Sequence, residues 1–271
     1  MAASTLTVVP PIRGEGSPNQ FHRRSVAALY ADKVPFLIGG AYMVEVCGGV
    51  SRSTKDFDLY VRPKHVHAAL KALARAGYKT ELTFPHWLAK ATYDGDILDL
   101  IFRAGNGLCE VDDSWFNRAR DDELLGVPVK LCASEEMIWM KAYIMERERF
   151  DGADIAHILR CSAADIDWPH LVRRFGPDWR VLLSHLILFG FVYPGERTLI
   201  PAAIMEDLMS RLRSETRTAG PQRLCRGTLL SRQQYLVDIR DWGFRDARLE
   251  ERVHMSEKDI AHWTEAIEEQ Q

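Results

Sequence analysis

The 271-residue sequence predicts an α/β (α+β) protein, in which a mixed β-sheet flanked by helices is followed by an all-helical C-terminal region. Short apolar strands alternate with helical segments as far as residue 132, which is typical of a sheet covered by helices. From residue 133 onward, apolar residues recur at three-to-four spacing, which is typical of packed helices. We therefore expect a flexible N-terminal lead over residues 1–24, an α/β domain over 25–132 and a helical domain over 133–271.

The first predicted elements are a strand, a glycine turn and a helix. Phe36 to Ile38 form a short apolar run that stops at Gly39 and Gly40, and residues 41–47 have helix-forming composition. Glycine lets the backbone approach an anion closely, and the unpaired amides at a helix start point toward it. The turn therefore predicts a phosphate cradle to which both glycines contribute.

The next predicted strand carries two aspartates. Residues 56–61 alternate along the strand, so Asp56 and Asp58 share one face while Phe57, Leu59 and Val61 share the other. Two carboxylates held this close favour a cation between them, and hard oxygen ligands suit Mg²⁺ or Mn²⁺. By itself the pair also fits a solvated edge strand. Its position after a strand, a glycine turn and a helix favours a metal site beside a nucleoside triphosphate.

The rest of the α/β domain is predicted from its turn residues. A helix is expected over residues 65–76, because the alanine-rich segment ends at Gly77. Asp94-Gly95 is a dipeptide favoured in two-residue hairpin turns. Strands are expected over residues 78–84, 87–93 and 96–102.

The second half is predicted to be helical. A helix is expected to begin at Ser134, with the hydroxyl as its cap and Glu135 and Glu136 in its first turn. Residues 215–227, rich in Arg, Thr and Gly, predict a linker or mobile loop. Further helices are expected around residues 154–159 and over 167–175, 179–191, 202–214, 231–242 and 256–269.

Composition excludes several classes of protein. The net charge of −3 argues against broad, nonspecific coating of nucleic acid. None of the five cysteines are spaced as Cys-x-x-Cys, and the nine histidines are scattered along the sequence, so a zinc site is not predicted. No apolar run reaches membrane-spanning length, and the N-terminus lacks a basic leader followed by an apolar block. We expect a cytoplasmic protein without a membrane partner.

The strand, Gly-Gly turn, helix and Asp-x-Asp strand together resemble the signature of the DNA polymerase β-like nucleotidyltransferase superfamily. The matching residues are Gly39, Gly40, Asp56 and Asp58. The spelling around the aspartates is most similar to small bacterial AbiEii-like members, some of which are linked to antitoxins, and these often carry Arg-x-Thr before the acids. The resemblance covers about residues 35–160. It implies a nucleotide site to which Arg52 and Thr54 contribute.

The same resemblance implies three further site residues. A third carboxylate on a later strand is matched by Asp99, with Asp96 as the reserve candidate. A lysine on a following helix and an aspartate at the start of the next one are matched by Lys141 and Asp154. The alternatives are a strand-edge acid for Asp99, a surface lysine for Lys141 and a helix-capping aspartate for Asp154.

The function that follows is a metal-dependent nucleotidyltransferase, which moves a nucleoside monophosphate from an NTP to a hydroxyl acceptor and releases pyrophosphate. In this hypothesis Asp56, Asp58 and Asp99 are catalytic and hold Mg²⁺ or Mn²⁺. The acceptor is open between RNA or tRNA, a protein and a small molecule, and a cognate antitoxin is a possible partner. The alternative is a non-catalytic nucleotide-binding or protein-interaction module that retains the fold.

Overall fold

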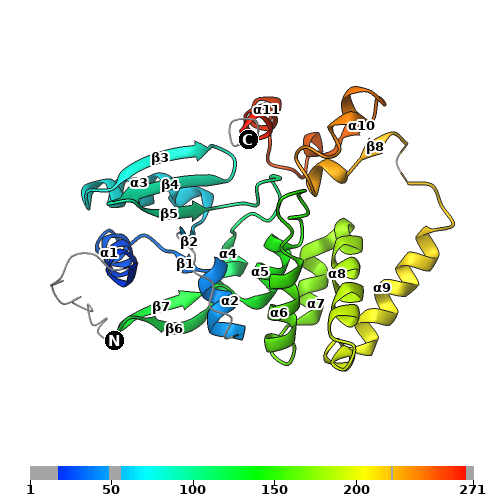
Figure 1. The fold of residues 1–271 in the computed structure, drawn as a ribbon, viewed down its shortest axis with the longest axis horizontal. Helices are drawn as coiled ribbons and strands as arrows, with labels where there is room; N and C mark the ends of the chain where they lie inside the picture. Colours follow the sequence, from blue (N-terminus) through cyan, green and yellow to red (C-terminus); the bar gives the residue numbers. More distant parts are fainter. Residues whose placement is uncertain (1–17, 49–55, 221, 267–271) are drawn as a thin grey trace.

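The computed structural model describes residues 18–48, 56–220 and 222–266. In these residues, seven strands form one mixed sheet in the order β3-β4-β5-β2-β1-β7-β6 (Figure 1). Strand β2 runs parallel to β5 and β1 runs parallel to β7, whereas the other neighbours are antiparallel. The strands are β1 (Leu37–Ile38), β2 (Asp56–Tyr60), β3 (Lys79–Phe84), β4 (Leu88–Tyr93), β5 (Asp96–Ile101), β6 (Arg120–Leu124) and β7 (Val127–Leu131). The mixed sheet that the sequence predicts is confirmed.

The hairpin between β4 and β5 has the turn that the sequence predicts. Asp94 and Gly95 both have positive φ, at 52° and 89°, which a two-residue turn of the I′ type requires. Tyr93 therefore pairs with Asp96, and the antiparallel register continues from there along both strands. This register decides which side chain of β4 faces each residue of β5.

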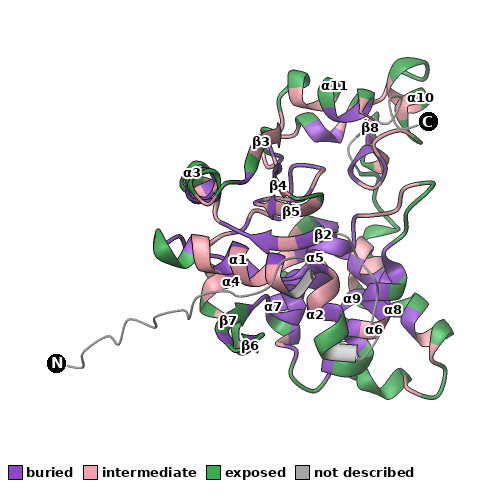
Figure 2. Cartoon of the chain, turned by 60° about the vertical axis from the view of Figure 1, so that its left-hand side comes forward, coloured by how far each residue is buried: buried purple, intermediate pink, exposed green. Residues whose placement is uncertain are grey.

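Alternate residues of β2 belong to two different apolar cores, one on each face of the sheet. Leu59 packs in a core with Leu98 and with helices α1 (Pro18–Ala31) and α3 (Val66–Arg75). Tyr60 packs in the other core, which continues into the helical half of the chain. Figure 2 shows buried residues along the sheet and on the helices that cover it. Side chains of even and odd number on β2 therefore reach different environments.

The second core contains the helices that follow the glycine turn and the sheet. Helix α2 begins directly at the turn and contacts α6, while α5 contacts both α6 and α7. Helix α9 extends along the outside of α8 (Figure 1). The helices are α2 (Gly40–Gly48), α4 (Asp113–Asn117), α5 (Ser134–Lys141), α6 (Gly152–Ser162), α7 (Trp168–Phe175), α8 (Trp179–Val192) and α9 (Ala202–Glu215).

The last part of the chain turns back toward the sheet. Helix α11 (Glu257–Glu265) packs against β3, where the rings of His262 and Phe84 lie 5.0 Å apart. Two short strands, β8 (Leu224–Cys225) and β9 (Arg245–Asp246), pair in parallel, so this part is not helical throughout. Between them, α10 (Leu236–Arg240) is shorter than the helix expected over residues 231–242.

Two local expectations are corrected. Helix α1 begins at Pro18, inside the segment that the sequence assigned to the lead, because Phe21 and Val26 supply apolar contacts to the first core. Helix α5 is capped at Ala133, which provides no side-chain hydrogen bond, and Glu135 and Glu136 are buried. Their carboxylates have tertiary partners, which take precedence over the local capping preference.

Within the part of the chain that the structure describes, none of the helices combines the length and the apolar character needed to cross a bilayer.

Candidate active site

Asp58 and Asp99 occupy directly paired positions on the neighbouring parallel strands β2 and β5. Adjacent strands lie about 4.8 Å apart, and residues in register point to the same face. Both aspartates line one cavity of about 210 Å³, together with Tyr60 and Ile101 from the same strands. The strands thus bring the second and third predicted carboxylates together. The side chain of Asp56 lies outside the described residues.

Gly40 lies directly against the Asp58 carboxylate. Its φ of +58° is in the left-handed region, and a Cβ at this position would overlap the carboxylate oxygen Oδ2 of Asp58. Two independent constraints, backbone conformation and lack of space, therefore require glycine here. The turn predicted as a phosphate cradle closes tightly around one of the predicted acids.

Gly39 contributes to the site differently from the expectation. Its amide N–H donates a 3.3 Å hydrogen bond to the carbonyl of Asp58, so it is used within the protein. A Cβ on Gly39 would lie only 2.5 Å from the ring of Tyr60. Gly39 therefore allows the Tyr60 ring to pack beside the turn, and its contact with phosphate stays a prediction.

Tyr60 presents a neutral hydroxyl to the cavity. Burial, reinforced by the negative charge of Asp58, raises the pKa of Tyr60 well above its ordinary value. The phenol thus remains protonated across the physiological range and can donate a hydrogen bond.

Asp99 also has a cationic neighbour. Lys90 lies opposite Asp99 in the β4–β5 register, and its Nζ is 3.2 Å from Oδ1 of the carboxylate. The reserve candidate Asp96 belongs to the opposite face of β5, since it alternates with Leu98 and Leu100 of the first core. The structure therefore favours Asp99 over Asp96 as the acid that faces the cavity.

Positive side chains line the same cavity as the carboxylates. Lys141, at the end of α5, is only 8% exposed and its Nζ lies 2.8 Å from Asp151 and 2.7 Å from Asp154. Lys141 is thus a buried residue held by two acids, and the surface interpretation is ruled out. Asp154 is not among the cavity-lining residues. Its observed contact is with the lysine.

Arg149 is a second cation at Asp151, and the sequence did not predict it as a site residue. It lines the cavity and donates to both oxygens of Asp151, at 2.9 Å and 3.0 Å. Burial opposes ionisation of Asp151, but the hydrogen bonds from Arg149 and the charge of Lys141 outweigh it and lower its pKa. The hydrogen bond from Arg149 to Asp151, with the added charge of Asp58, raises the pKa of Arg149. Asp151 therefore holds both Lys141 and Arg149 at the cavity.

The donor set fits a divalent metal ion as far as it is described. Asp58 and Asp99 supply hard oxygen atoms on rigid strands, and Gly40 leaves room for the first of these carboxylates. Among the described residues, no group of three or more His, Cys, Asp or Glu side chains is arranged around a common metal position. Arg52 and Thr54, predicted to contact nucleotide, lie outside the described residues.

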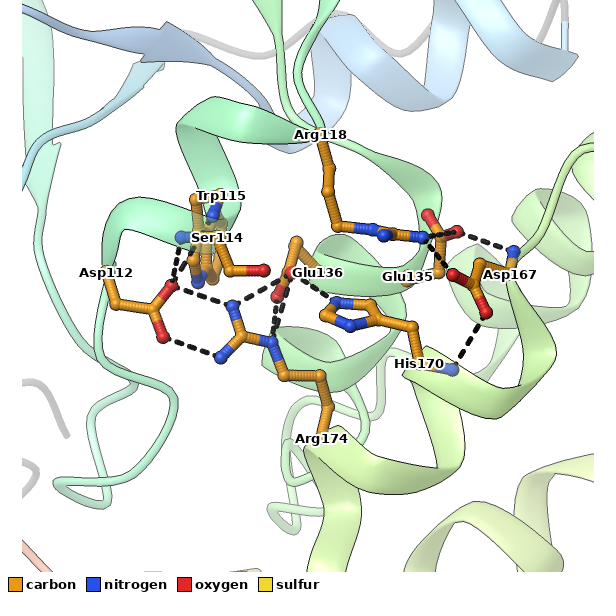
Figure 3. Close-up of polar contacts among 9 residues, drawn as sticks. All are labelled: Asp112, Ser114, Trp115, Arg118, Glu135, Glu136, Asp167, His170 and Arg174. Atoms are coloured by element: carbon orange, nitrogen blue, oxygen red, sulfur yellow. Dashed lines mark hydrogen bonds and ion pairs between the residues drawn. The ribbon is translucent and has the colours of Figure 1, made fainter.

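A buried polar network holds α5, the helix that ends at Lys141. Glu136 is fully buried; its carboxylate lies 2.8 Å from Nε2 of His170 and 2.8 Å from Nε of Arg174 (Figure 3). The same arginine makes two further bonds, of 2.7 Å and 2.8 Å, to Asp112, the residue that caps α4. One guanidinium thereby joins α4, α5 and α7.

A second set of contacts lies beside this arginine. The backbone amide of Asp167 donates a 2.7 Å hydrogen bond to Glu135. The carboxylate of Asp167 caps α7 by accepting from the amide of His170 (Figure 3). Arg118 completes the set with a 2.6 Å ion pair to Asp167. Both glutamates at the start of α5 are thus bound to α7, which fixes the direction in which the helix enters the cavity wall.

Comparison with known proteins defines the class of this chain. A family model described as "Nucleotidyl transferase of unknown function (DUF2204)" matches residues 20–167, more than half of the chain. The protein belongs to this family and is a nucleotidyltransferase. The matched region includes Asp58 and Asp99 as well as Lys141 and Arg149.

Solved structures with a similar arrangement were also found. The structure of ANT(2'')-Ia in complex with adenylyl-2''-tobramycin has 18% identity and a TM-score of 0.37, over 72% of this chain and 98% of that chain. The lincosamide antibiotic adenylyltransferase LnuA, lincomycin-bound, has 15% identity and a TM-score of 0.39, and the match covers 53% of this chain and 96% of that chain. An antigenic nucleotidyltransferase-like protein from Paracoccidioides brasiliensis has 17% identity and a TM-score of 0.43, over 70% and 98%. No curated protein matches the chain.

Proposed function

We propose that the protein is a metal-dependent nucleotidyltransferase that transfers a nucleoside monophosphate from an NTP to a hydroxyl acceptor and releases pyrophosphate. One observation carries the proposal. Asp58 and Asp99 lie in register on adjacent strands at the wall of a cavity that Lys141 and Arg149 also line. Acids and cations that line one cavity suit a ligand that is itself a metal-bound polyphosphate.

The carboxylates are assigned to the metal. Asp58 and Asp99 would hold Mg²⁺ or Mn²⁺, with Asp56 as the third predicted ligand on the same strand as Asp58. When bound, such an ion neutralises charge on the triphosphate and lowers the pKa of the attacking hydroxyl.

The cations and the phenol are assigned to the phosphates. Lys141 and Arg149 are held in place by Asp151, so they can oppose the charge that gathers on the departing pyrophosphate. The neutral hydroxyl of Tyr60 can donate a further hydrogen bond in the same cavity. In the reaction a bond forms between the acceptor oxygen and the α-phosphorus, and the bond from that phosphorus to pyrophosphate breaks.

Finer predictions concern the acceptor and the partners. RNA or tRNA, a protein side chain and a small molecule all remain candidates for the acceptor. The similarity to AbiEii-like enzymes, the cytoplasmic location and a cognate antitoxin remain predictions. Expression of this chain alone in a bacterial host tests the antitoxin: growth arrest that requires Asp58 is expected of a toxin.

Substitution of Asp58 tests the proposed function. Asp58→Asn keeps the shape of the side chain but removes the charge, so we expect nucleotide transfer to fall by at least about 100-fold. The measurement follows label from each α-labelled NTP, with magnesium and total RNA, into RNA, protein or small molecules. The control is Asp121→Asn, because Asp121 lies on β6 of the same sheet but is 88% exposed and ion-paired with Lys130.

Two outcomes would contradict the proposal. Transfer that survives in the Asp58→Asn variant at the wild-type rate would show that the carboxylate pair is not catalytic. A wild-type protein that binds NTP but releases no pyrophosphate with any acceptor would instead be a nucleotide-binding module.

A further inference from the structure

The cavity is completed by a segment that lies beyond the family match. Residues 224–265 return to the sheet after the helical half, and Leu229, Leu230, Arg232 and Trp263 from this segment line the cavity. These residues face the same space as Asp58 and Arg149 from the matched region. One wall of the proposed nucleotide site therefore comes from residues that lie outside the matched range 20–167.

Hydrogen bonds hold this wall against the matched region. The carbonyl of Leu230 accepts from the amide of Met145 at 3.1 Å. The carboxylate of Glu146 accepts from the hydroxyl of Ser231 at 2.7 Å and from the amide of Arg232 at 3.2 Å. Because backbone groups are bound, the position of residue 232 is set by the fold and not by the conformation of its side chain.

A third attachment comes from the loop after β5. The side-chain amide of Asn106, which is buried, donates a 2.8 Å hydrogen bond to the carbonyl of Leu229 and accepts from the amide of Leu108 at 3.0 Å. The wall is thus bound to two separate loops at the rim of the cavity.

The guanidinium of Arg232 lies in this wall with incomplete compensation of its charge. Its side chain is 23% exposed, its Nε is 3.4 Å from Glu146, and it lies over the ring of Trp263 at 5.4 Å. Burial lowers the pKa of Arg232 despite the attraction of Glu146, and the positive charge of Arg149 acts in the same direction as burial. A second anion between the two arginines would be bound favourably.

Arg149 and Arg232 line the same cavity as the proposed metal ligands Asp58 and Asp99. The charge of Asp58 acts on Arg149 and raises its pKa, and the charge of Arg149 acts on Arg232 and lowers its pKa. A triphosphate bound with its α-phosphorus at the acids would therefore have both guanidinium groups in the same cavity to bind its far end.

We propose that Arg232 binds the terminal phosphate of the NTP and, with Arg149, forms a clamp that selects triphosphates over monophosphates. This inference rests on the proposed function, since it assumes a nucleoside triphosphate in the cavity. Arginine suits the role because its planar donors match two phosphate oxygens at once.

Binding measurements test the clamp. ATP, GTP, CTP and UTP are titrated calorimetrically into the wild-type protein with magnesium, followed by the monophosphate of the nucleotide that binds most tightly. We expect Arg232→Gln to weaken triphosphate binding about 10- to 100-fold and to leave monophosphate binding within about twofold. Arg232→Lys keeps the charge and should show a smaller loss.

A matched control comes from the same segment. Arg226 is 43% exposed, pairs with Glu250 at 3.5 Å and does not line the cavity. Arg226→Gln should bind both nucleotides as the wild type does. Thermal unfolding of each variant checks that the wall is folded, and the Arg232→Lys protein keeps the test decisive where the glutamine variant unfolds.

Each other outcome has a definite meaning. Unchanged triphosphate binding in Arg232→Gln overturns the clamp while leaving the proposed function intact. An equal loss for triphosphate and monophosphate also overturns it, because Arg232 then supports the wall and not a phosphate. A wild-type protein that binds none of the four triphosphates overturns both proposals.

Discussion

Gly40 shows how one residue without a side chain can determine the position of a proposed catalytic group, the Asp58 carboxylate. The Asp58 carboxylate occupies the space that any Cβ at residue 40 would require, and the backbone there has a φ of +58°. Replacement of this glycine therefore moves the carboxylate or the turn. Either movement displaces a proposed metal ligand from its partner Asp99.

We expect Gly40→Ala to reduce nucleotide transfer by about 100-fold, because displacement of a catalytic group by about 1 Å has an effect of that size. The strained backbone should also lower the free energy of unfolding by about 1–2 kcal/mol. Initial rates of pyrophosphate release and chemical denaturation measure the two effects separately.

Gly95 provides the matched control for this prediction. It also has a positive φ, of +89°, but a Cβ there would meet nothing within 4 Å. Gly95→Ala should therefore lose stability by a similar amount and retain transfer. Equal loss of activity in both variants would show that general destabilisation, and not displacement of Asp58, explains the effect.

Single residues of the site differ in how far they could be predicted. Asp58 followed from strand alternation, and Asp99 from the resemblance. Lys90 was missed although the information was present: a two-residue turn at Asp94-Gly95 pairs residue 93 with 96, and counting back places Lys90 opposite Asp99. The mixture of polar and apolar residues around Arg232 gives only a weak indication of substrate contact, because its place in the cavity depends on a chain reversal that no local pattern encodes.

At the scale of elements, the position of α5 depends on Glu135 and Glu136, two acids that the helix-capping preference places in its first turn. The sequence predicts a cap at Ser134 with favourable acids after it, whereas the structure buries Glu135 and Glu136 against α7. Burial of an unpaired carboxylate is costly, so the partners on α7 decide the outcome. The start of the helix was thus predictable from sequence, but the tertiary partners of Glu135 and Glu136 were not.

Replacement of Arg174 should lower the free energy of unfolding more than replacement of any other residue of this network. Arg174→Met leaves the fully buried Glu136 without its guanidinium and also removes both bonds to Asp112. We expect the free energy of unfolding to fall by about 3–5 kcal/mol, the usual cost of removing one member of a buried ion pair. Urea denaturation followed by circular dichroism measures the change.

The adjacent Arg173 distinguishes this effect from a general loss of positive charge. Arg173 is exposed on the same helix, so Arg173→Met should alter stability by no more than about 0.5 kcal/mol. A small effect for Arg174→Met, similar to that of Arg173→Met, would mean that the network does not hold α5.

At the scale of the whole molecule, the cavity joins parts of the chain that are distant in sequence. Its lining comes from the sheet, from α5 and the loop after it, and from residues 229–263. A ligand bound there contacts all of these parts at once and stabilises the folded state by mass action. The proposed site is thus also a connection between the two halves of the chain.

Hydrogen exchange should reveal that connection. With magnesium and triphosphate at about 100 times Kd, the folded state gains about 2.7 kcal/mol, and exchange should slow in β2, in β5 and in residues 224–265 together. Helix α9 does not line the cavity and should exchange at an unchanged rate. Protection limited to the sheet would show that the C-terminal wall does not contact the nucleotide.

The mixed sheet and most helices were predicted because strand alternation and helical spacing are local properties. The arrangement of the last fifty residues was not, since the short strands β8 and β9 carry no periodic signal and gain their stability from packing. The expected helix over residues 231–242 is limited to residues 236–240 for the same reason, because residues 230–232 are bound to the loop at 145–146.

The position of α11 also affects how this molecule meets other proteins. Strand β3 forms one border of the sheet, and its unpaired backbone groups would be a template for another chain if they were open. Helix α11 packs against that strand. At the other border, β6 has the sequence Arg-Asp-Asp-Glu-Leu, whose charges discourage a neighbour. The helix that contributes Trp263 to the cavity lining therefore also packs against a border strand of the sheet.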